Sequence, residues 1–152
     1  MSNGLVNTRD QQFVLFEQLG IEKLFEYDAY KDFSRDDLQM ILNEAEKLAV
    51  NELAPCNKEG DEEGCHIKDG VVTVPKCFRE PFKKYAEGGW INPMDSPEVG
   101  GQGLPAAVGF AALEYFGAAN YAFSMYPGLT HGAAMLINEA GTPEQKKKYM
   151  EK

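Results

Sequence analysis

Residues 105–141 read PAAVGFAALEYFGAANYAFSMYPGLTHGAAMLINEAG, and this stretch decides the fold because almost nothing in it is charged. Glu114 and Glu139 are the only acidic or basic residues among its 37 positions. A helix that is apolar on every side must be covered on every side. We therefore predict two helices, near 105–117 and 119–140, that lie in a helical core or at an interface.

The uncharged run within this stretch, residues 115–138, has the length of a membrane-spanning helix. Its polar content argues against that role, because Asn120, Thr130 and His131 lower its hydrophobicity and Pro127 interrupts it. We therefore expect no membrane span.

Phe116-Gly117 is expected to separate the two helices, and the second one contains a proline. Pro127 has no backbone N–H and clashes with the carbonyl group four residues earlier, so we expect a bend there. Such a defect suits the wall of a cavity better than a uniform core. The second helix should fill the centre of the bundle or, as the proline favours, face a ligand or partner. The residues beside the bend are Met125, Tyr126, Gly128, Leu129 and Thr130.

The preceding residues predict an arm and one long amphipathic helix. Residues 1–30 are expected to form an N-terminal arm with one or two short helices, one of which ends at Gly20. Ser34 and Asp37 have the spacing of a capping box, and Pro55 stops the helix that follows. The apolar stripe of that helix comprises Leu38, Ile41, Leu42, Ala45, Leu48, Ala49 and Leu53.

The middle of the chain predicts a loop, a hairpin and a further helix. Residues 56–64 combine four acidic residues with two glycines and are expected to form a solvated loop. Asp69-Gly70 predicts a β-hairpin near 66–74, which should lie against helices because an isolated hairpin is marginal in water. The next helix should end at Gly88-Gly89, with Trp90 as a core anchor. Its apolar residues are Phe78, Phe82 and Tyr85.

Composition and charge place the chain among ordinary globular domains. It has 152 residues, 43% of them hydrophobic, and a net charge of −9. An acidic chain repels the phosphates of nucleic acids and anionic lipids, so neither partner is expected. The cysteines match no zinc spacing and follow no signal peptide, so we expect free thiols in the cytoplasm and no metal site. They are Cys56, Cys65 and Cys77.

Residues 97–105 are the most motif-like segment. Positions 101–106 fit the spacing G-x-G-x-x-A of a dinucleotide-binding loop, but that loop requires a preceding strand in a parallel sheet. Prolines and no β pattern precede it here. We therefore expect a structural loop that leads into the next helix. Its defining residues are Glu98, Gly100, Gly101 and Gly103.

The last residues predict the start of another helix. Thr142 caps it, Pro143 takes its first position, and Gln145 completes a capping box. Few residues follow, and so short a helix is marginal alone. We therefore expect the sequence to be a domain taken from a longer protein.

Several of these segments form a characteristic series: Gly88-Gly89-Trp90, the loop PEVGGQG at 97–103, the uncharged helix pair, and AGTPEQK at 140–146. Their order and spacing closely resemble the N-terminal helical domain of acyl-CoA dehydrogenases. The opening residues 9–15 and the hairpin turn KDGV are similar to long members with an N-terminal extension. Val99 departs from the family, which often has an acidic or aromatic residue there.

The resemblance implies flavin-dependent α,β-dehydrogenation of an acyl-CoA thioester. In the family a glutamate of the C-terminal helical domain removes the α proton and FAD accepts the β hydride. The flavin contacts lie mainly in the middle and C-terminal domains. We therefore expect no catalytic residue and no bound FAD in this chain. Surface carboxylates, rather than the catalytic base, are expected at Glu98, Glu114 and Glu139.

The resemblance also implies that this domain forms one wall of the acyl pocket. Aligned on Ala140-Gly141, that wall falls on Met125, Tyr126, Gly128, Leu129 and Gly132. An acyl chain needs an apolar slot, and glycines leave room for it. Middle and C-terminal domains absent from this chain would be its partners, and without them the exposed apolar face is expected to promote self-association.

The sequence as a whole predicts an all-α bundle of about five to six helices with one small β-hairpin near 66–74. Residues 1–30 form the arm, and residues 31–152 form the acyl-CoA dehydrogenase N-terminal domain, which is inactive alone. A different hypothesis is a stand-alone helical module whose apolar groove binds a lipid or a partner helix. Bound flavin would contradict the first hypothesis, whereas saturable acyl binding would favour the second.

Overall fold

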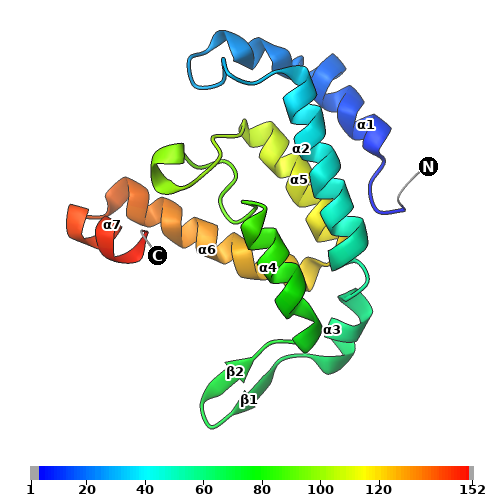
Figure 1. Cartoon of the computed structure of the whole chain (residues 1–152), viewed down its shortest axis with the longest axis vertical. Helices are drawn as coiled ribbons and strands as arrows, with labels where there is room; N and C mark the ends of the chain where they lie inside the picture. The colour runs from blue at the N-terminus through cyan, green and yellow to red at the C-terminus, as the bar shows by residue number, and fades with distance from the viewer. Residues whose placement is uncertain (1–3, 151–152) are drawn as a thin grey trace.

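The computed structural model describes residues 4–150, which form an α-helical fold with one small hairpin, as predicted (Figure 1). Residues 1–3 of the predicted arm and 151–152 of the predicted domain lie outside the described residues. The α-helices are α1 (Thr8–Gln12), α2 (Arg35–Leu48), α3 (Asn57–Glu63), α4 (Arg79–Glu87), α5 (Ala106–Ala119), α6 (Tyr121–Ala140) and α7 (Pro143–Tyr149). The hairpin consists of β1 (His66–Lys68) and β2 (Val71–Thr73), paired antiparallel. Shorter 3₁₀ or π turns lie at Phe13–Gln18, Ile21–Glu26, Ala49–Leu53, Lys76–Phe78 and Pro97–Val99.

Helix α5 lies at the centre of the fold, beside α2 (Figure 1). Val108, Tyr115 and Phe116 on it are buried almost completely. Small residues let neighbouring segments approach closely: Gly109 lies against Met94 with no room for a β-carbon. The first half of the uncharged stretch therefore supplies the central helix of the bundle.

The N-terminal arm packs onto α2 and α5. Leu15, Phe16 and Ile21 form one apolar cluster with side chains of both helices. The predicted end of a helical turn at Gly20 is confirmed, since Gly20 has a φ of +58°. The division of the chain at residue 30 stays a prediction.

The predicted capping box at the start of α2 is confirmed. The Asp37 carboxylate accepts hydrogen bonds from the hydroxyl and the backbone N–H of Ser34, at 2.6 and 2.8 Å. These bonds hold the pKa of Asp37 below its usual value. The matching box at Thr142 and Gln145 also forms and begins α7.

The prediction of a loop at 56–64 is wrong, because this segment contains helix α3. Gly60 is buried so close to the ring of Phe78 that a β-carbon there would collide with it. Lys58 and Glu62, one turn apart, form an ion pair at 3.8 Å. The sequence pattern hides this helix because its buried position is a glycine rather than a large apolar residue.

The predicted hairpin turn is confirmed, but the hairpin does not lie flat against helices as predicted. Asp69 and Gly70 both have positive φ, which a two-residue hairpin loop of type I′ requires. All the strand residues are exposed, and the hairpin projects from the body at the lower end of Figure 1. Only its flanks, at Cys65 and Val74, reach the helical body.

The break predicted at Phe116-Gly117 lies further on, at Asn120, because α5 continues through Gly117. The Asn120 side chain is 1% exposed. Its Oδ1 accepts the N–H of Phe123 at 3.0 Å and caps α6, while its Nδ2 donates to the Leu53 carbonyl at 3.4 Å. One amide thus starts α6 and fixes it to the end of the first long helical segment.

Helix α6 runs without interruption through Pro127.

Trp90 is 7% exposed and packs edge-on against Phe116, so its predicted role as a core anchor is confirmed. Within residues 4–150 no helix combines the length and the apolar character needed to cross a membrane.

Replacing Asn120 by alanine should lower the free energy of unfolding by about 2–4 kcal/mol, from the lost helix cap and the lost hydrogen bond to the Leu53 carbonyl. Asn120→Ser keeps a capping oxygen and should lose less. Denaturant unfolding followed by circular dichroism measures both. Asn51→Ala, on an exposed asparagine, is the control and should change stability by about 0.5 kcal/mol or less. Equal losses in the two alanine variants would contradict the role assigned to Asn120.

Candidate functional site

Helix α6 leaves the body with one long face uncovered, and α7 lies at its far end (Figure 1). Successive residues of an α-helix are turned by about 100°, so positions 121, 125, 129, 132 and 136 share one side. Leu129 and Leu136 on that side are 71% and 69% exposed. We call this surface the outer stripe. It consists of Tyr121, Met125, Gly128, Leu129, Gly132 and Leu136, all of them exposed.

Two glycines of the outer stripe have no packing reason within the described chain. A β-carbon added at Gly128 or Gly132 would meet nothing within 4 Å. In contrast, Gly60, Gly101 and Gly109 are each pressed against a neighbour. A mid-helix glycine costs about 1 kcal/mol relative to alanine. The open space above these two positions is therefore a feature of the surface itself.

The inner face of α6 holds the helix to the body. Phe123 is completely buried, and its ring lies 5.6–6.1 Å from the rings of Phe78, Phe82 and Tyr85. Pro127, one turn further on, is also buried. Burial raises the pKa of Tyr85. This aromatic cluster leaves the opposite side of α6 free.

Tyr126 lies apart from the other predicted wall residues. Its hydroxyl is 3.4 Å from the thiol of Cys65, just before the hairpin, and its ring packs edge-on against Phe78. The contact with Cys65, together with partial burial, raises the pKa of Tyr126 to about 12. The structure thus brings Met125, Gly128, Leu129 and Gly132 together on the outer stripe and turns Tyr126 toward the hairpin.

A polar contact missed by the sequence analysis ties the second half of α6 to the glycine-rich segment. Nδ1 of His131 lies 3.1 Å from the Asp95 carboxylate, and the two side chains are 20% and 18% exposed. His131 is the single histidine in a helix with one charged residue. That isolation could have indicated a partner, but nothing in the sequence points to Asp95.

The glycine-rich segment is a closed structural loop. Gly100 and Gly103 have positive φ, and Gly101 passes too close to the Asp95 backbone for any side chain. Its N–H groups are already used, since Gly100, Gly101 and Gly103 donate to Pro97, Ser96 and Asp95 carbonyls at 2.9–3.1 Å. A phosphate needs free N–H groups. Glu98 is exposed on this loop, which does not form a phosphate cradle.

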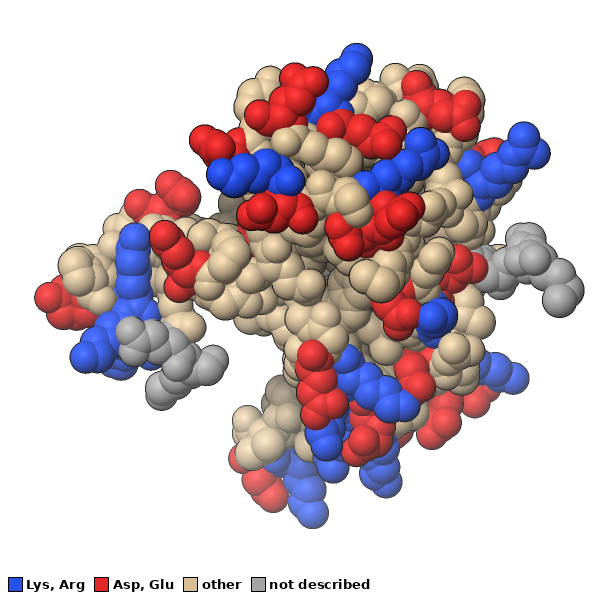
Figure 2. All heavy atoms as spheres, turned by 45° about the horizontal axis from the view of Figure 1, so that its top comes forward, with Lys and Arg blue, Asp and Glu red and all other residues tan. Residues whose placement is uncertain are grey.

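The acidic residues of the uncharged stretch do not form a catalytic group. Glu114 accepts a hydrogen bond from the buried Gln11 side chain at 2.8 Å, and Glu139 is exposed. Among residues 4–150 no cluster of three metal-binding side chains occurs. Figure 2 shows acidic and basic side chains interspersed over the visible face, rather than one large area of a single sign.

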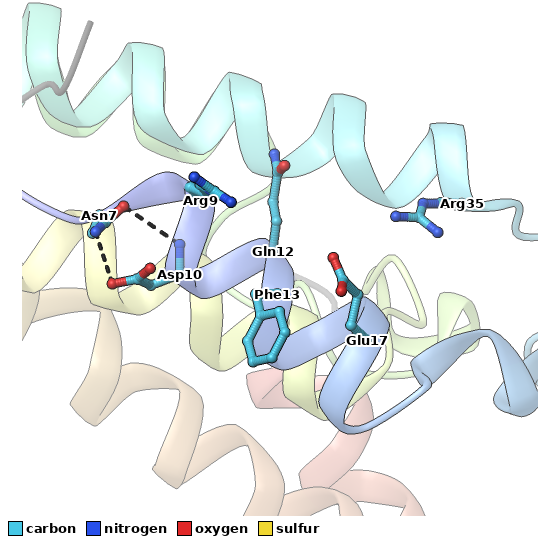
Figure 3. Close-up of a pocket in the computed structure, with 7 residues that line it drawn as sticks. All are labelled: Asn7, Arg9, Asp10, Gln12, Phe13, Glu17 and Arg35. Atoms are coloured by element: carbon cyan, nitrogen blue, oxygen red, sulfur yellow. Dashed lines mark hydrogen bonds between the residues drawn. The ribbon is translucent and has the colours of Figure 1, made fainter.

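A polar hollow of about 480 Å³ beside the arm is a further candidate (Figure 3). Arg9, Glu17 and Arg35 line it but point in separate directions in Figure 3. The only hydrogen bonds between the residues drawn there join Asn7 and Asp10. Side chains that do not converge on one point give this hollow no defined chemistry.

Comparison with protein families gives one match over most of the chain. The family described as the N-terminal domain of acyl-CoA dehydrogenases matches residues 35–152. That range begins at the first residue of α2 and includes the whole uncharged helix pair.

Several curated proteins are similar to the chain over most of its length. The 3-methylmercaptopropionyl-CoA dehydrogenase of Ruegeria pomeroyi is 32% identical over 81% of this chain and 21% of its own. The broad-specificity linear acyl-CoA dehydrogenase FadE5 of Mycobacterium tuberculosis is 34% identical over 97% of this chain and 24% of its own length. A butyryl-CoA dehydrogenase of Syntrophomonas wolfei is 30% identical over 99% of this chain and 25% of its own length. The chain therefore spans about a quarter of the length of these relatives.

Removing the imidazole of His131 should loosen the second half of α6. In His131→Ala, backbone amides after residue 131 are expected to exchange with deuterium roughly tenfold faster, the equivalent of about 1.4 kcal/mol. Amides near Phe123 should keep their protection. Thr130→Ala, at the adjacent exposed position, serves as the control. Unchanged exchange in His131→Ala would show that Asp95 does not hold this helix.

Proposed function

The chain belongs to the acyl-CoA dehydrogenase family, and from that premise we propose that its helix α6 forms one wall of the pocket for the acyl group of an acyl-CoA thioester. The outer stripe carries this proposal. It offers apolar side chains and two open glycine positions on a single exposed face. An alkyl chain needs an apolar slot with room close to the backbone. Family membership favours this function over a stand-alone lipid-binding or partner-binding module.

The wall consists of Met125, Gly128, Leu129 and Gly132, with Tyr126 at its edge toward the hairpin. A single helix face cannot enclose a ligand, because small-molecule sites bury most of the ligand surface. The remaining walls would come from middle and C-terminal domains like those of longer relatives. These domains and an acyl-CoA are thus the proposed partners, in a cytoplasmic protein.

The flavin and the catalytic base are proposed to lie outside this chain. Members of the family generally use FAD, but the glycine-rich loop here does not fit its pyrophosphate, since the N–H groups are bonded within the loop. Glu98 and Glu139 are exposed, and Glu114, on α5, accepts a hydrogen bond from Gln11. The chain alone is therefore expected not to oxidise acyl-CoA, whereas the whole protein is proposed to be an oxidoreductase that dehydrogenates the thioester.

Filling one of the open glycine positions tests the wall. In a protein that joins this chain to the flavin-binding domains, Gly132→Met should raise the KM for longer acyl-CoA substrates roughly tenfold or more, because the new side chain occupies acyl space. Bound FAD, measured by its absorbance, should be unchanged. Steady-state kinetics over a series of acyl lengths would measure the effect.

The matched control is Ala133→Met. Ala133 is a small, exposed residue that is turned by about 100° around the helix from Gly132. It should leave KM near the wild-type value. Gly132→Ala in the chain alone should stabilise the helix slightly, which separates acyl binding from folding. Equal effects of Gly132→Met and Ala133→Met, or a parallel loss of FAD, would contradict the proposed wall.

The outer stripe should also make the isolated chain self-associate, because an apolar patch without its partner favours contact between copies. Sedimentation velocity should show dimers or larger species whose fraction rises with protein concentration. Leu129→Asp should shift the equilibrium toward monomer. A wild-type chain that stays monomeric at high concentration would contradict this expectation.

A further inference from the structure

A second apolar hollow lies between the hairpin, α4 and α6. Its volume is about 360 Å³, at the lower end of the range for small-molecule sites. Val74 lies on the hairpin side, Phe78 and Phe82 on the second side, and Phe123 with Tyr126 on the third. Arg79, the first residue of α4, is the only charged residue among residues 4–150 that lines it.

The walls of this hollow are held by contacts with one another and with neighbouring segments. Phe78 is pressed against Gly60 of α3, and Phe123 is enclosed by three aromatic rings. Tyr126 is held at its hydroxyl by the thiol of Cys65. Even so, Phe82 and Tyr126 stay 38% and 37% exposed. The exposed aromatic surface of the hollow thus comes from Phe82 and Tyr126, with Phe78 and Phe123 buried behind them.

The described lining of the hollow carries one charge, the positive charge of Arg79. Acidic residues lie nearby on α3, where the Glu63 carboxylate accepts the backbone N–H of Lys76 at 3.0 Å. Lys68, Lys76 and Arg79 form no ion pair in the part of the chain that the structure describes. Positive charge that is not neutralised locally attracts an anion, and a guanidinium pairs especially well with a carboxylate.

We propose that this hollow binds a small hydrophobic carboxylate, whose apolar group lies against the exposed sides of Phe82 and Tyr126 while its anionic end meets Arg79. The aromatic faces and edges suit an aryl or short alkyl group. The carboxylate stays at the rim, where the Arg79 guanidinium provides the charge. The ligand therefore needs both an apolar group and a carboxylate.

This site adjoins the proposed acyl wall at Tyr126 but otherwise consists of different residues. Tyr126 is turned by about 100° from Met125 around α6, toward the hairpin, and the other residues of the hollow lie outside the outer stripe. The hollow lies entirely within residues 74–126 and needs no further domain to form its walls. The proposal therefore does not depend on the function proposed for the outer stripe.

Calorimetric titration of the 152-residue chain with phenylbutyrate tests the site, with phenylbutanol as the uncharged probe of the same shape. Phenylbutyrate should bind saturably, and the alcohol should bind about tenfold more weakly. Arg79→Gln should remove this preference, so that both probes bind alike. Lys83→Gln, a cation on the same helix that does not line the hollow, should keep it.

Two further variants locate the ligand. Phe82→Ala should weaken both probes, and its circular dichroism will show whether the helices stay intact. Leu129→Asp on the outer stripe should leave both affinities unchanged. Absence of binding at millimolar probe, equal affinity for acid and alcohol in the wild type, or loss of binding in Leu129→Asp would each overturn the proposal.

Discussion

The structure depends on one buried amide at the corner between α5 and α6. Asn120 caps α6 through the N–H of Phe123 and also donates to the carbonyl of Leu53, so its side chain joins three segments. Its Nδ2 also approaches the Cys56 thiol at 3.6 Å. The Ser124 hydroxyl donates a hydrogen bond to the backbone carbonyl of Asn120. A buried amide is costly unless its groups are paired, and here both ends of the side chain are. That pairing determines where the central helix stops and in which direction the next helix leaves.

The direction set at this corner explains the surface of α6. The first turn lies against the aromatic cluster through Phe123, and the helix then runs out of the body, with the outer stripe uncovered. Two side contacts hold it at different points. Tyr126 meets Cys65 beside the hairpin, and His131 meets Asp95 of the glycine-rich segment. The glycine-rich loop thus acts as a support for α6, a role that needs its tight internal hydrogen bonds rather than free N–H groups.

Sequence patterns predicted the elements whose signals are local. The capping boxes at Ser34 and Thr142, the turn at Asp69-Gly70 and the termination at Gly20 depend on residues within a few positions, and all are present. Errors arose where a distant contact decides. Helix α3 is placed by the fit of Gly60 against Phe78, which no periodicity reveals. The contacts of Tyr126 and His131 join positions 61 and 36 residues apart. Their partners are ordinary residues of loops, so the sequence carried no sign of them.

The two halves of the uncharged stretch show why composition could not assign their environments. Both contain alanine, glycine and aromatic residues, yet seven of the 14 residues of α5 are buried and only two of the 20 residues of α6. The difference lies in what the glycines meet. At Gly109 of α5 the Met94 side chain occupies the space that a β-carbon would need. At Gly128 and Gly132 that space is open. Two mid-helix glycines reduce helix stability, and packing within residues 4–150 does not require them. The proposed acyl wall would give them a use, because an acyl chain on the outer stripe would approach the α6 backbone closely at these two positions.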